Sequence, residues 1–355
     1  MTDIPIRRAE HTKPRPPAMA LGFGQYFTDH MFVAEYEPER GWRNPRIQPY
    51  APLMIDPAAS VLQYAQALFE GLKAIRSVSG KLNLFRPDRH VERWARGAAR
   101  MCMPVVPPEL MLDGIKELVK VDHDWVPSEP NTALYLRPTL IGTEGFLGVR
   151  PSSTYTFFVI ASPVGAYYEE GFNPVSIWIE EECVRAARGG LGAIKASANY
   201  AASLYAGERA KEKGYAQVLW LDAAEHKYFE EVGTMNVFVQ IGDTLYTPPL
   251  EGSLLEGVTR NSILTLLRDW NYGVAERRIS VDELARAHDE GQLKEVFGCG
   301  TGAVISPVGE LAHKNKRMVI NDRRPGPVSQ RLFETLTGIQ QGRLPDTRGW
   351  LVPVM

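Results

Sequence analysis

The first feature with chemical potential is a lysine in an otherwise uncharged stretch. Residues 189–207 contain a single charged side chain, Lys195, mostly among small and apolar residues. Burial in such surroundings lowers the pKa of an amine, and a neutral amine is what condensation with an aldehyde cofactor requires. A lysine whose stem packs while its ammonium reaches solvent would fit the same pattern, so the stretch leaves both interpretations open.

Three further side chains have types that suit a cofactor ring. Tyr200 follows the lysine and could donate a hydrogen bond to a phenolate, or pack inside a helix. Glu230 and Glu231 precede an apolar strand, and one of them is expected to point inward because successive strand residues face opposite sides. A buried carboxylate there could keep a pyridine nitrogen protonated, whereas a solvated strand entry is the alternative interpretation.

Groups that could bind an anion are also present. The Gly-Thr turns at residues 257–259 and 300–302 could offer backbone amides and hydroxyls to phosphate or carboxylate oxygens, although such turns are common. Arg93 lies on a predicted helix and could clamp a phosphate. The residues alone do not separate it from three neighbouring arginines, Arg89, Arg96 and Arg100.

Interleaved strands and helices must position these residues, in the pattern of a mixed α/β or α+β protein. We predict strands at residues 27–36, 81–85, 135–138, 154–161 and 216–222, and helices at 90–101, 108–122, 199–213 and 259–270, with Thr259 as an N-cap. Strands at 237–241 and 244–246 should form a hairpin around Gly242 and Asp243. We divide the chain into a loose arm (1–20), a small N-terminal α/β domain (21–168), a linker (169–182) and a large C-terminal domain (183–355).

Composition narrows the possible functions. The 355 residues include 40 Lys and Arg against 42 Asp and Glu, so no net field favours nucleic acid or an anionic membrane. The apolar runs are strand-sized and too short to span a bilayer. Cys102, Cys183 and Cys299 lie too far apart for a disulfide framework or a close-spaced metal site. We therefore predict no bound metal and a cytoplasmic location.

Several motifs occur in one order along nearly the whole chain. They are Phe27-Thr28-Asp29-His30-Met31, Phe69-Glu70-Gly71-Leu72-Lys73-Ala74, Tyr135-Leu136-Arg137-Pro138, Ile194-Lys195, Asn199-Tyr200, Glu231-Val232-Gly233-Thr234-Met235-Asn236, Gly257-Val258-Thr259-Arg260, Gly300-Thr301 and Leu336-Thr337-Gly338-Ile339-Gln340. In these motifs the sequence resembles the branched-chain amino acid aminotransferases of the class IV pyridoxal-phosphate family. The resemblance implies a two-domain fold type IV enzyme with pyridoxal 5'-phosphate between the domains.

The resemblance also implies roles for the cofactor residues. Lys195 would be the Schiff-base lysine and would shuttle the substrate proton. Glu231 would face the pyridine nitrogen and Tyr200 the phenolic oxygen. Arg93 would bind the phosphate, within a cofactor-binding set that also includes Thr234, Val258, Thr259 and Thr301.

For the substrate, the resemblance implies an uncharged aromatic pocket that prefers Leu, Ile and Val side chains. Its members would be Tyr64, Phe69, Tyr135 and Tyr167. The amides of Thr301 and Gly302, with the Tyr64 hydroxyl, would bind the α-carboxylate. Arg137 would pair with the distal carboxylate of glutamate. Val149, in the loop at residues 145–150, would reach into the partner subunit's pocket, which implies a homodimer.

The implied reaction is a reversible ping-pong transfer of the amino group of leucine, isoleucine or valine to 2-oxoglutarate. D-amino acid transaminases and aminodeoxychorismate lyases share the lysine, the glutamate and the glycine turns, and a non-catalytic binder of pyridoxal phosphate is a further alternative. Two departures from the family are visible. Ala196-Ser197-Ala198 replaces the Gly-Gly of many relatives, and Ala303 and Ser306 stand where some animal members have a redox pair of cysteines, so we expect no thiol switch.

Overall fold

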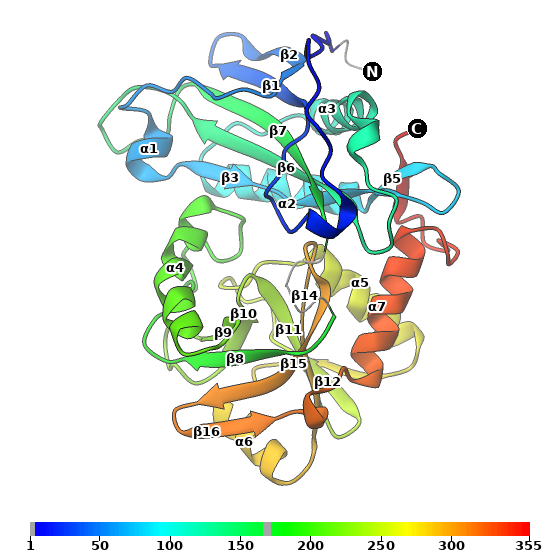
Figure 1. The fold of residues 1–355 in the computed structure, drawn as a ribbon. Coiled ribbons are helices and arrows are strands. Elements are labelled where there is room, and N and C mark those ends of the chain that lie inside the picture. The colour runs from blue at the N-terminus through cyan, green and yellow to red at the C-terminus, as the bar shows by residue number, and fades with distance from the viewer. Residues whose placement is uncertain (1–3, 166–171) are drawn as a thin grey trace. The chain divides into compact units, whose positions relative to one another are not determined.

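The computed structural model describes residues 4–165 and 172–355, which form two compact units (Figure 1). The N-terminal unit contains the described residues up to 165 together with residues 195–198 and 338–355. The C-terminal unit contains residues 172–194 and 199–337. Lys195 therefore belongs by its contacts to the N-terminal unit. The chain just before residue 195 and just after residue 198 belongs to the C-terminal unit.

An antiparallel sheet of eight strands forms the core of the N-terminal unit. Its order is β17-β5-β4-β6-β7-β1-β2, and β3 pairs with β6. The strands are β1 (His30–Glu37), β2 (Gly41–Pro49), β3 (Ala67–Phe69), β4 (Leu72–Arg76), β5 (Leu82–Phe85), β6 (Ala133–Gly142), β7 (Tyr155–Val164) and β17 (Leu351–Pro353). Since β17 pairs with β5, the last residues of the chain complete the sheet that the first residues begin.

Helices α1 (Ser60–Tyr64), α2 (Pro87–Arg100) and α3 (Pro108–Val121) belong to the same unit, with short 3-10 turns at Ala18–Ala20 and His123–Trp125. Both longer helices begin at a proline, whose fixed φ suits the first helical position. Trp94 of α2 packs edge-on against Phe157 of β7 at 5.3 Å between ring centroids. Gly114 lets α3 approach β1, because a Cβ there would lie 2.8 Å from the Phe32 ring.

The N-terminal segment, expected to form a loose arm, is held against this sheet. Ile4 is buried, and Ile6 forms a β-bridge with Ile47 of β2. The amide of Ala9 donates to His30 Nε2 at 2.9 Å. The prediction failed because these contacts are made by backbone groups and isolated apolar side chains, which leave no periodic pattern in the sequence.

The C-terminal unit is built on nine strands in the order β10-β9-β8-β15-β14-β11-β12-β13, and β16 pairs with β15. The strands are β8 (Val175–Glu180), β9 (Gln217–Leu221), β10 (Phe229–Val232), β11 (Met235–Ile241), β12 (Thr244–Thr247), β13 (Gly273–Glu276), β14 (Leu293–Gly300), β15 (Val304–His313) and β16 (Lys316–Val319). Because β10 also pairs with β11, six of these strands close into a ring. A cluster of buried aliphatic and aromatic side chains, including Ile177, Leu219 and Val237, forms its core.

Four helices belong to the C-terminal part of the chain: α4 (Ser197–Glu212), α5 (Val258–Asp269), α6 (Val281–Asp289) and α7 (Pro327–Gln340), with a 3-10 turn at Asn321–Arg323. The predicted hairpin is confirmed, since Ile241 pairs with Thr244 across a two-residue turn in which Gly242 has a φ of 58°. Helix α5 begins one residue earlier than predicted, and Gly257 rather than Thr259 is its N-cap.

Part of the linker predicted at residues 169–182 is a strand of the core. Residues 175–180 form β8, which lies between β9 and β15 and pairs in parallel with both. A strand that is paired on both sides is part of the core and cannot act as a linker. In the parts of the chain that the structure describes, no helix combines the length and apolarity needed to cross a bilayer.

Candidate active site

Lys195 lies against the sheet of the N-terminal unit. Its carbonyl oxygen accepts a hydrogen bond from the Phe69 amide at 3.1 Å, and Ala196 forms a β-bridge with Leu68. The ammonium nitrogen lies 4.7 Å from the centroid of the Phe69 ring. Burial lowers the pKa of Lys195 to about 8; Tyr135 and Glu70 oppose this shift, while the Arg93 and Arg137 charges add to it. The neutral amine is therefore far more populated near physiological pH than in an ordinary lysine, in the direction that the uncharged sequence window predicted.

Three of the predicted substrate residues surround this amine. The Arg137 guanidinium lies 4.6 Å from the Phe69 ring centroid and donates to the Tyr135 hydroxyl at 3.3 Å. Its Nε is buried without a hydrogen-bond partner among the described residues. Gly71 makes room for the tyrosine, because a Cβ at that position would lie 1.9 Å from the Tyr135 hydroxyl. The site thus combines aromatic walls with one cation that retains donor capacity.

Phe23 extends this aromatic wall and had no predicted role. Its ring meets the Tyr135 ring edge-on at 4.9 Å between centroids. The flanking Gly22 and Gly24 have φ values of 54° and 72°, which other residues rarely adopt. A Gly-aromatic-Gly triplet is a signal that could have indicated a side chain displayed by a tight turn.

Arg93 belongs to a buried cluster with Glu70 and His90. Its Nε and Nη2 donate to the two Glu70 oxygens at 2.7 and 2.8 Å, and His90 Nδ1 lies 2.8 Å from Glu70 Oε2. Although burial raises the pKa of Glu70, the Arg93 charge and these hydrogen bonds hold it well below its usual range. Burial lowers the pKa of His90, which stays neutral. Among the arginines of α2, the structure buries Arg93 and leaves Arg96 and Arg100 exposed.

Tyr64 and Val149 lie on one exposed surface of the N-terminal unit. Tyr64 ends α1, is 42% exposed, and its hydroxyl donates to the Leu147 carbonyl in the loop at residues 145–150. Val149 is 89% exposed in the same loop. The structure therefore joins Tyr64 to the Val149 loop. Tyr167, the last predicted pocket residue, lies outside the described residues.

In the C-terminal unit Glu231 has the partners of an ionised carboxylate. Arg185 Nε lies 3.1 Å from its Oε2, while the Leu255 amide and the Asn236 side chain donate to its Oε1 at 3.0 and 3.3 Å. Glu231 and its neighbour Glu230 are both buried. The sequence predicts that one of the pair points inward; both are buried because all four residues of β10 are covered, on both faces of the strand.

The predicted anion-binding turns also lie in the C-terminal unit. Val258 and Thr259 are the first two residues of α5, which begins without a side-chain cap and so presents backbone amides. Gly257 keeps this helix start close to β11, since a Cβ would lie 2.0 Å from Asn236 Oδ1. Thr301 and Gly302 form the turn between β14 and β15, and Thr234 is exposed in the turn between β10 and β11.

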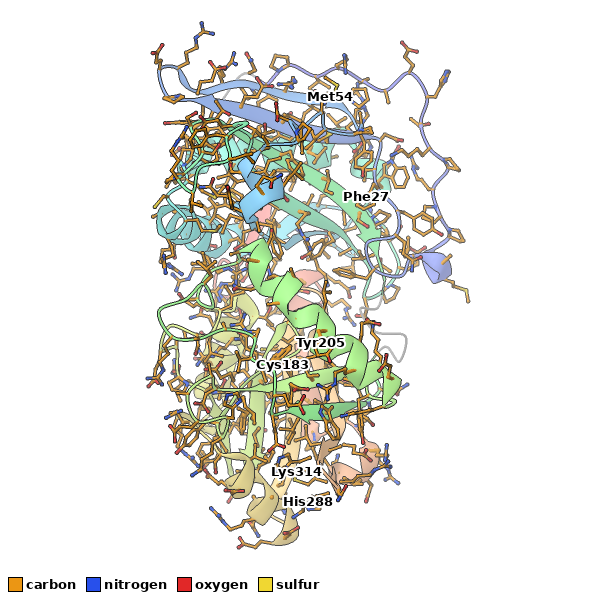
Figure 2. All side chains as sticks on the ribbon, turned by 90° about the vertical axis from the view of Figure 1, so that its left-hand side faces the viewer. Phe27, Met54, Cys183, Tyr205, His288 and Lys314 are labelled. Atoms are coloured by element: carbon orange, nitrogen blue, oxygen red, sulfur yellow. The ribbon has the colours of Figure 1, made fainter. Side chains whose placement is uncertain are left out.

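Tyr200 lies in the first turn of α4, which is fixed by its neighbour Asn199. The Asn199 amide donates to the carbonyl oxygens of Leu191 and Ile194 at 2.8 and 3.1 Å, just before Lys195 in the chain. Asn199 therefore ties α4 to the turn that carries the lysine. Further along the helix, Tyr205 lies on an exposed face (Figure 2).

Within the described residues no cluster of three His, Cys, Asp or Glu side chains could hold a metal ion. The structure thus gathers Lys195, Phe69, Tyr135, Arg137 and Arg93 in one unit. It places Tyr200, Glu231, Thr234, Val258, Thr259, Thr301 and Gly302 in the other.

Comparison with known proteins defines the family. The profile of the amino-transferase class IV family matches residues 67–311. Branched-chain-amino-acid aminotransferase 2 of Bacillus subtilis is 50% identical over 351 residues, covering 99% of this chain and 97% of the relative. Branched-chain-amino-acid transaminase 1 of the same organism is 51% identical over 352 residues, covering 99% of both chains. The chain therefore belongs to the class IV aminotransferases.

Solved structures agree with this family. The branched-chain amino acid aminotransferase of Escherichia coli superposes with a TM-score of 0.77 at 25% identity, covering 92% of this chain and 99% of the other. The enzyme of a T.th. strain, solved with pyridoxamine 5'-phosphate, gives a TM-score of 0.77 at 26% identity, covering 91% and 98%. These relatives share the mixed fold type IV architecture described above.

Proposed function

We propose that the protein is a branched-chain amino acid aminotransferase that uses pyridoxal 5'-phosphate. It transfers the amino group of L-leucine, L-isoleucine or L-valine to 2-oxoglutarate. The observation that supports this most directly is the amine of Lys195, whose pKa burial lowers to about 8 beside Phe69, Tyr135 and Arg137. The near 50% identity with branched-chain aminotransferases over almost the whole chain supports the substrate class.

The residues present fit this cofactor. Lys195 offers a neutral amine for an aldehyde, and Glu231 is a buried carboxylate with the partners of an anion, suited to a pyridinium nitrogen. The uncapped start of α5 at Val258 and Thr259 suits a phosphate, as does the buried Arg93. Tyr200, Thr234 and Thr301 complete the proposed binding set. When bound, the cofactor supplies an aldehyde and an electron-withdrawing ring.

Lys195 acts as the base in this proposal. Its Nζ in the neutral form takes the proton from the α-carbon of the amino acid and later returns it. A pKa near 8 suits both directions, because the ammonium and amine forms are each populated at working pH. The aromatic ring of Phe69 beside Nζ limits the approach of water.

The pocket explains how one site accepts two kinds of substrate. Phe69 and Tyr135 offer apolar surface to a branched side chain, which gains about 25 cal/mol per Å² buried. Arg137 supplies the positive charge for the distal carboxylate of glutamate or 2-oxoglutarate, using the Nε that lacks a partner among the described residues. The turn at Thr301 and Gly302 is proposed to bind the α-carboxylate that all substrates share.

We place Tyr64 and Val149 in a homodimer, where their common surface reaches the pocket of the partner subunit. Their exposure and the bond from Tyr64 to the loop support this assignment. Val149 is apolar and 89% exposed, as expected for a residue that is covered on assembly. A cytoplasmic location is consistent with three free cysteines.

An absorbance spectrum of the purified protein tests the function. The band of the bound cofactor should shift when L-leucine is added and return when 2-oxoglutarate follows, whereas D-alanine should have no effect. If the band does not shift with L-leucine but shifts with D-alanine, the protein is a D-amino acid transaminase instead. A protein that cannot be loaded with the cofactor would overturn the proposal.

A further inference from the structure

Glu230, the buried neighbour of Glu231 on β10, has no role in the reaction proposed above. It is 8% exposed, and the Ser253 hydroxyl donates to its Oε1. Its Oε2 is buried and has no hydrogen-bond partner among the residues that the structure describes. An ionised carboxylate in such a place would leave one charged oxygen unsatisfied, which is strongly unfavourable.

The charged side chains around Glu230 are already paired with one another. Arg185 pairs with Glu231, Arg188 with Glu251, and Arg278 with both Asp222 and Glu225. These three cations already face four anions, so the group has no spare positive charge for Glu230. Glu230 is the additional acid of the group, beside an ionised neighbour and, within the described part of the chain, without a cation of its own.

Two adjacent buried carboxylates that share one cation do not both ionise readily. Glu231 has the cation and two hydrogen-bond donors, so it is the member that stays ionised. Burial raises the pKa of Glu230, with Arg185 opposing and the Glu231 and Asp222 charges adding to the rise. Geometry and electrostatics therefore agree on which acid holds the proton.

Ser253 connects Glu230 to the residues around Glu231. Its carbonyl oxygen accepts a hydrogen bond from Arg185 Nη2, and the next residue but one, Leu255, donates its amide to Glu231. Gly192 must lack a side chain here, because a Cβ would lie 2.1 Å from the Ser253 carbonyl oxygen. The loop at residues 253–255 is thus fixed at one end by Glu230 and at the other by Glu231.

We propose that Glu230 is a protonated carboxylic acid that positions the loop at residues 253–255, and thereby Arg185 and Glu231, without carrying charge itself. This inference rests on the proposed function, in which Glu231 faces the pyridine nitrogen. Glu230 is a positioning residue, since it acts through Ser253. A neutral acid holds the loop without adding a second negative charge beside Glu231.

The first experiment compares wild type, Glu230→Gln and Glu230→Ala, all loaded with pyridoxal phosphate. Gln has the shape of a protonated Glu, so Glu230→Gln should keep kcat and the cofactor dissociation constant within about twofold. Glu230→Ala should weaken cofactor binding about tenfold, because Ser253 loses its partner. An equal loss in both variants would overturn the proposal, since a required negative charge is absent from both.

The second experiment detects the proton without relying on activity. The infrared spectrum of wild type at neutral pH should contain the carbonyl band of a protonated carboxylic acid. The control Glu212→Gln, which alters an exposed acid, should keep this band. The band should be missing in Glu230→Gln. Its absence from wild type would overturn the proposal for Glu230 even if the protein is a transaminase, and its presence would uphold the protonation if the transaminase assignment failed.

Discussion

In the N-terminal unit one acid, Glu70, is shared by two bases, Arg93 and His90, whereas in the C-terminal unit two acids, Glu230 and Glu231, share Arg185. In the first cluster His90 is neutral and adds no positive charge. In the second cluster Glu230 is protonated and adds no negative charge. Each buried cluster thus retains one ion pair. The comparison shows that each buried cluster keeps only those charges that form an ion pair. The third titratable side chain of each cluster serves as a neutral hydrogen-bonding group.

The largest expected effect comes from removing the amine itself. Lys195→Ala should lower turnover by about 10³-fold or more, because the proton transfer loses its base. Steady-state kinetics with L-leucine and 2-oxoglutarate measure the loss. The apoprotein should not lose stability, since a buried amine is unfavourable when charged. Near-normal turnover would contradict the role of Lys195.

Glu70→Ala should break the N-terminal cluster. It leaves Arg93 buried without its carboxylate, which should lower the free energy of unfolding by about 3–5 kcal/mol. Urea denaturation of the apoprotein measures this change. Glu92→Gln is a suitable control, because Glu92 forms an exposed pair with Arg89 on the same helix and should alter the stability by less than about 1 kcal/mol.

The two acids should give stability contributions of opposite sign against pH. The lowered pKa of Glu70 means that its contribution is complete above the unfolded value of 4.5 and is lost as pH falls toward the folded value. The raised pKa of Glu230 means that its contribution is present below 4.5 and is lost as pH rises through the folded value. The free energy of unfolding, measured from acid to neutral pH for wild type, Glu70→Gln and Glu230→Gln, separates the contributions of the two acids. Parallel curves for the variants would refute the contrast.

A basic group adds a further pH dependence at higher pH. Since burial lowers the pKa of Lys195 from 10.5 to about 8, the folded apoprotein binds fewer protons than the unfolded chain between these values. Its stability should rise with pH across that window, and Lys195→Met should reduce the rise. The effect should be halved rather than abolished, because burial also lowers the pKa of Lys73 to about 8.

The smallest expected effect concerns the wall of the pocket. Gly71→Ala places a methyl group where the Tyr135 hydroxyl lies, and such overpacking costs about 1–3 kcal/mol. The KM for L-leucine should rise while the protein stays folded. Gly80→Ala is a control for the loss of a glycine. The new Cβ at position 80 would have no atoms within 4 Å, although the positive φ there adds strain of its own. An unchanged KM for L-leucine in Gly71→Ala would contradict the assignment of Tyr135 to the substrate pocket.

Local chemistry allowed much of this arrangement to be predicted. The hairpin at Gly242 follows from turn residues, and the lowered pKa of Lys195 follows from a charge-free window. The choice of Arg93 among four arginines could not be made from spacing, because burial by the sheet decides it. The burial of both Glu230 and Glu231 depends on the chain that covers each face of β10, which a single strand's alternation does not reveal. The cofactor and substrate roles stay predictions.

The short segment at residues 195–198 has a consequence for how the chain folds. The N-terminal unit includes this segment and also β17 at Leu351–Pro353, so it is assembled from three separate stretches of the chain. The described part of the C-terminal unit lies within residues 172–337. Contacts between segments this far apart in the sequence, including the contact of Lys195 with Phe69, form only after the long intervening chain has been closed into a loop.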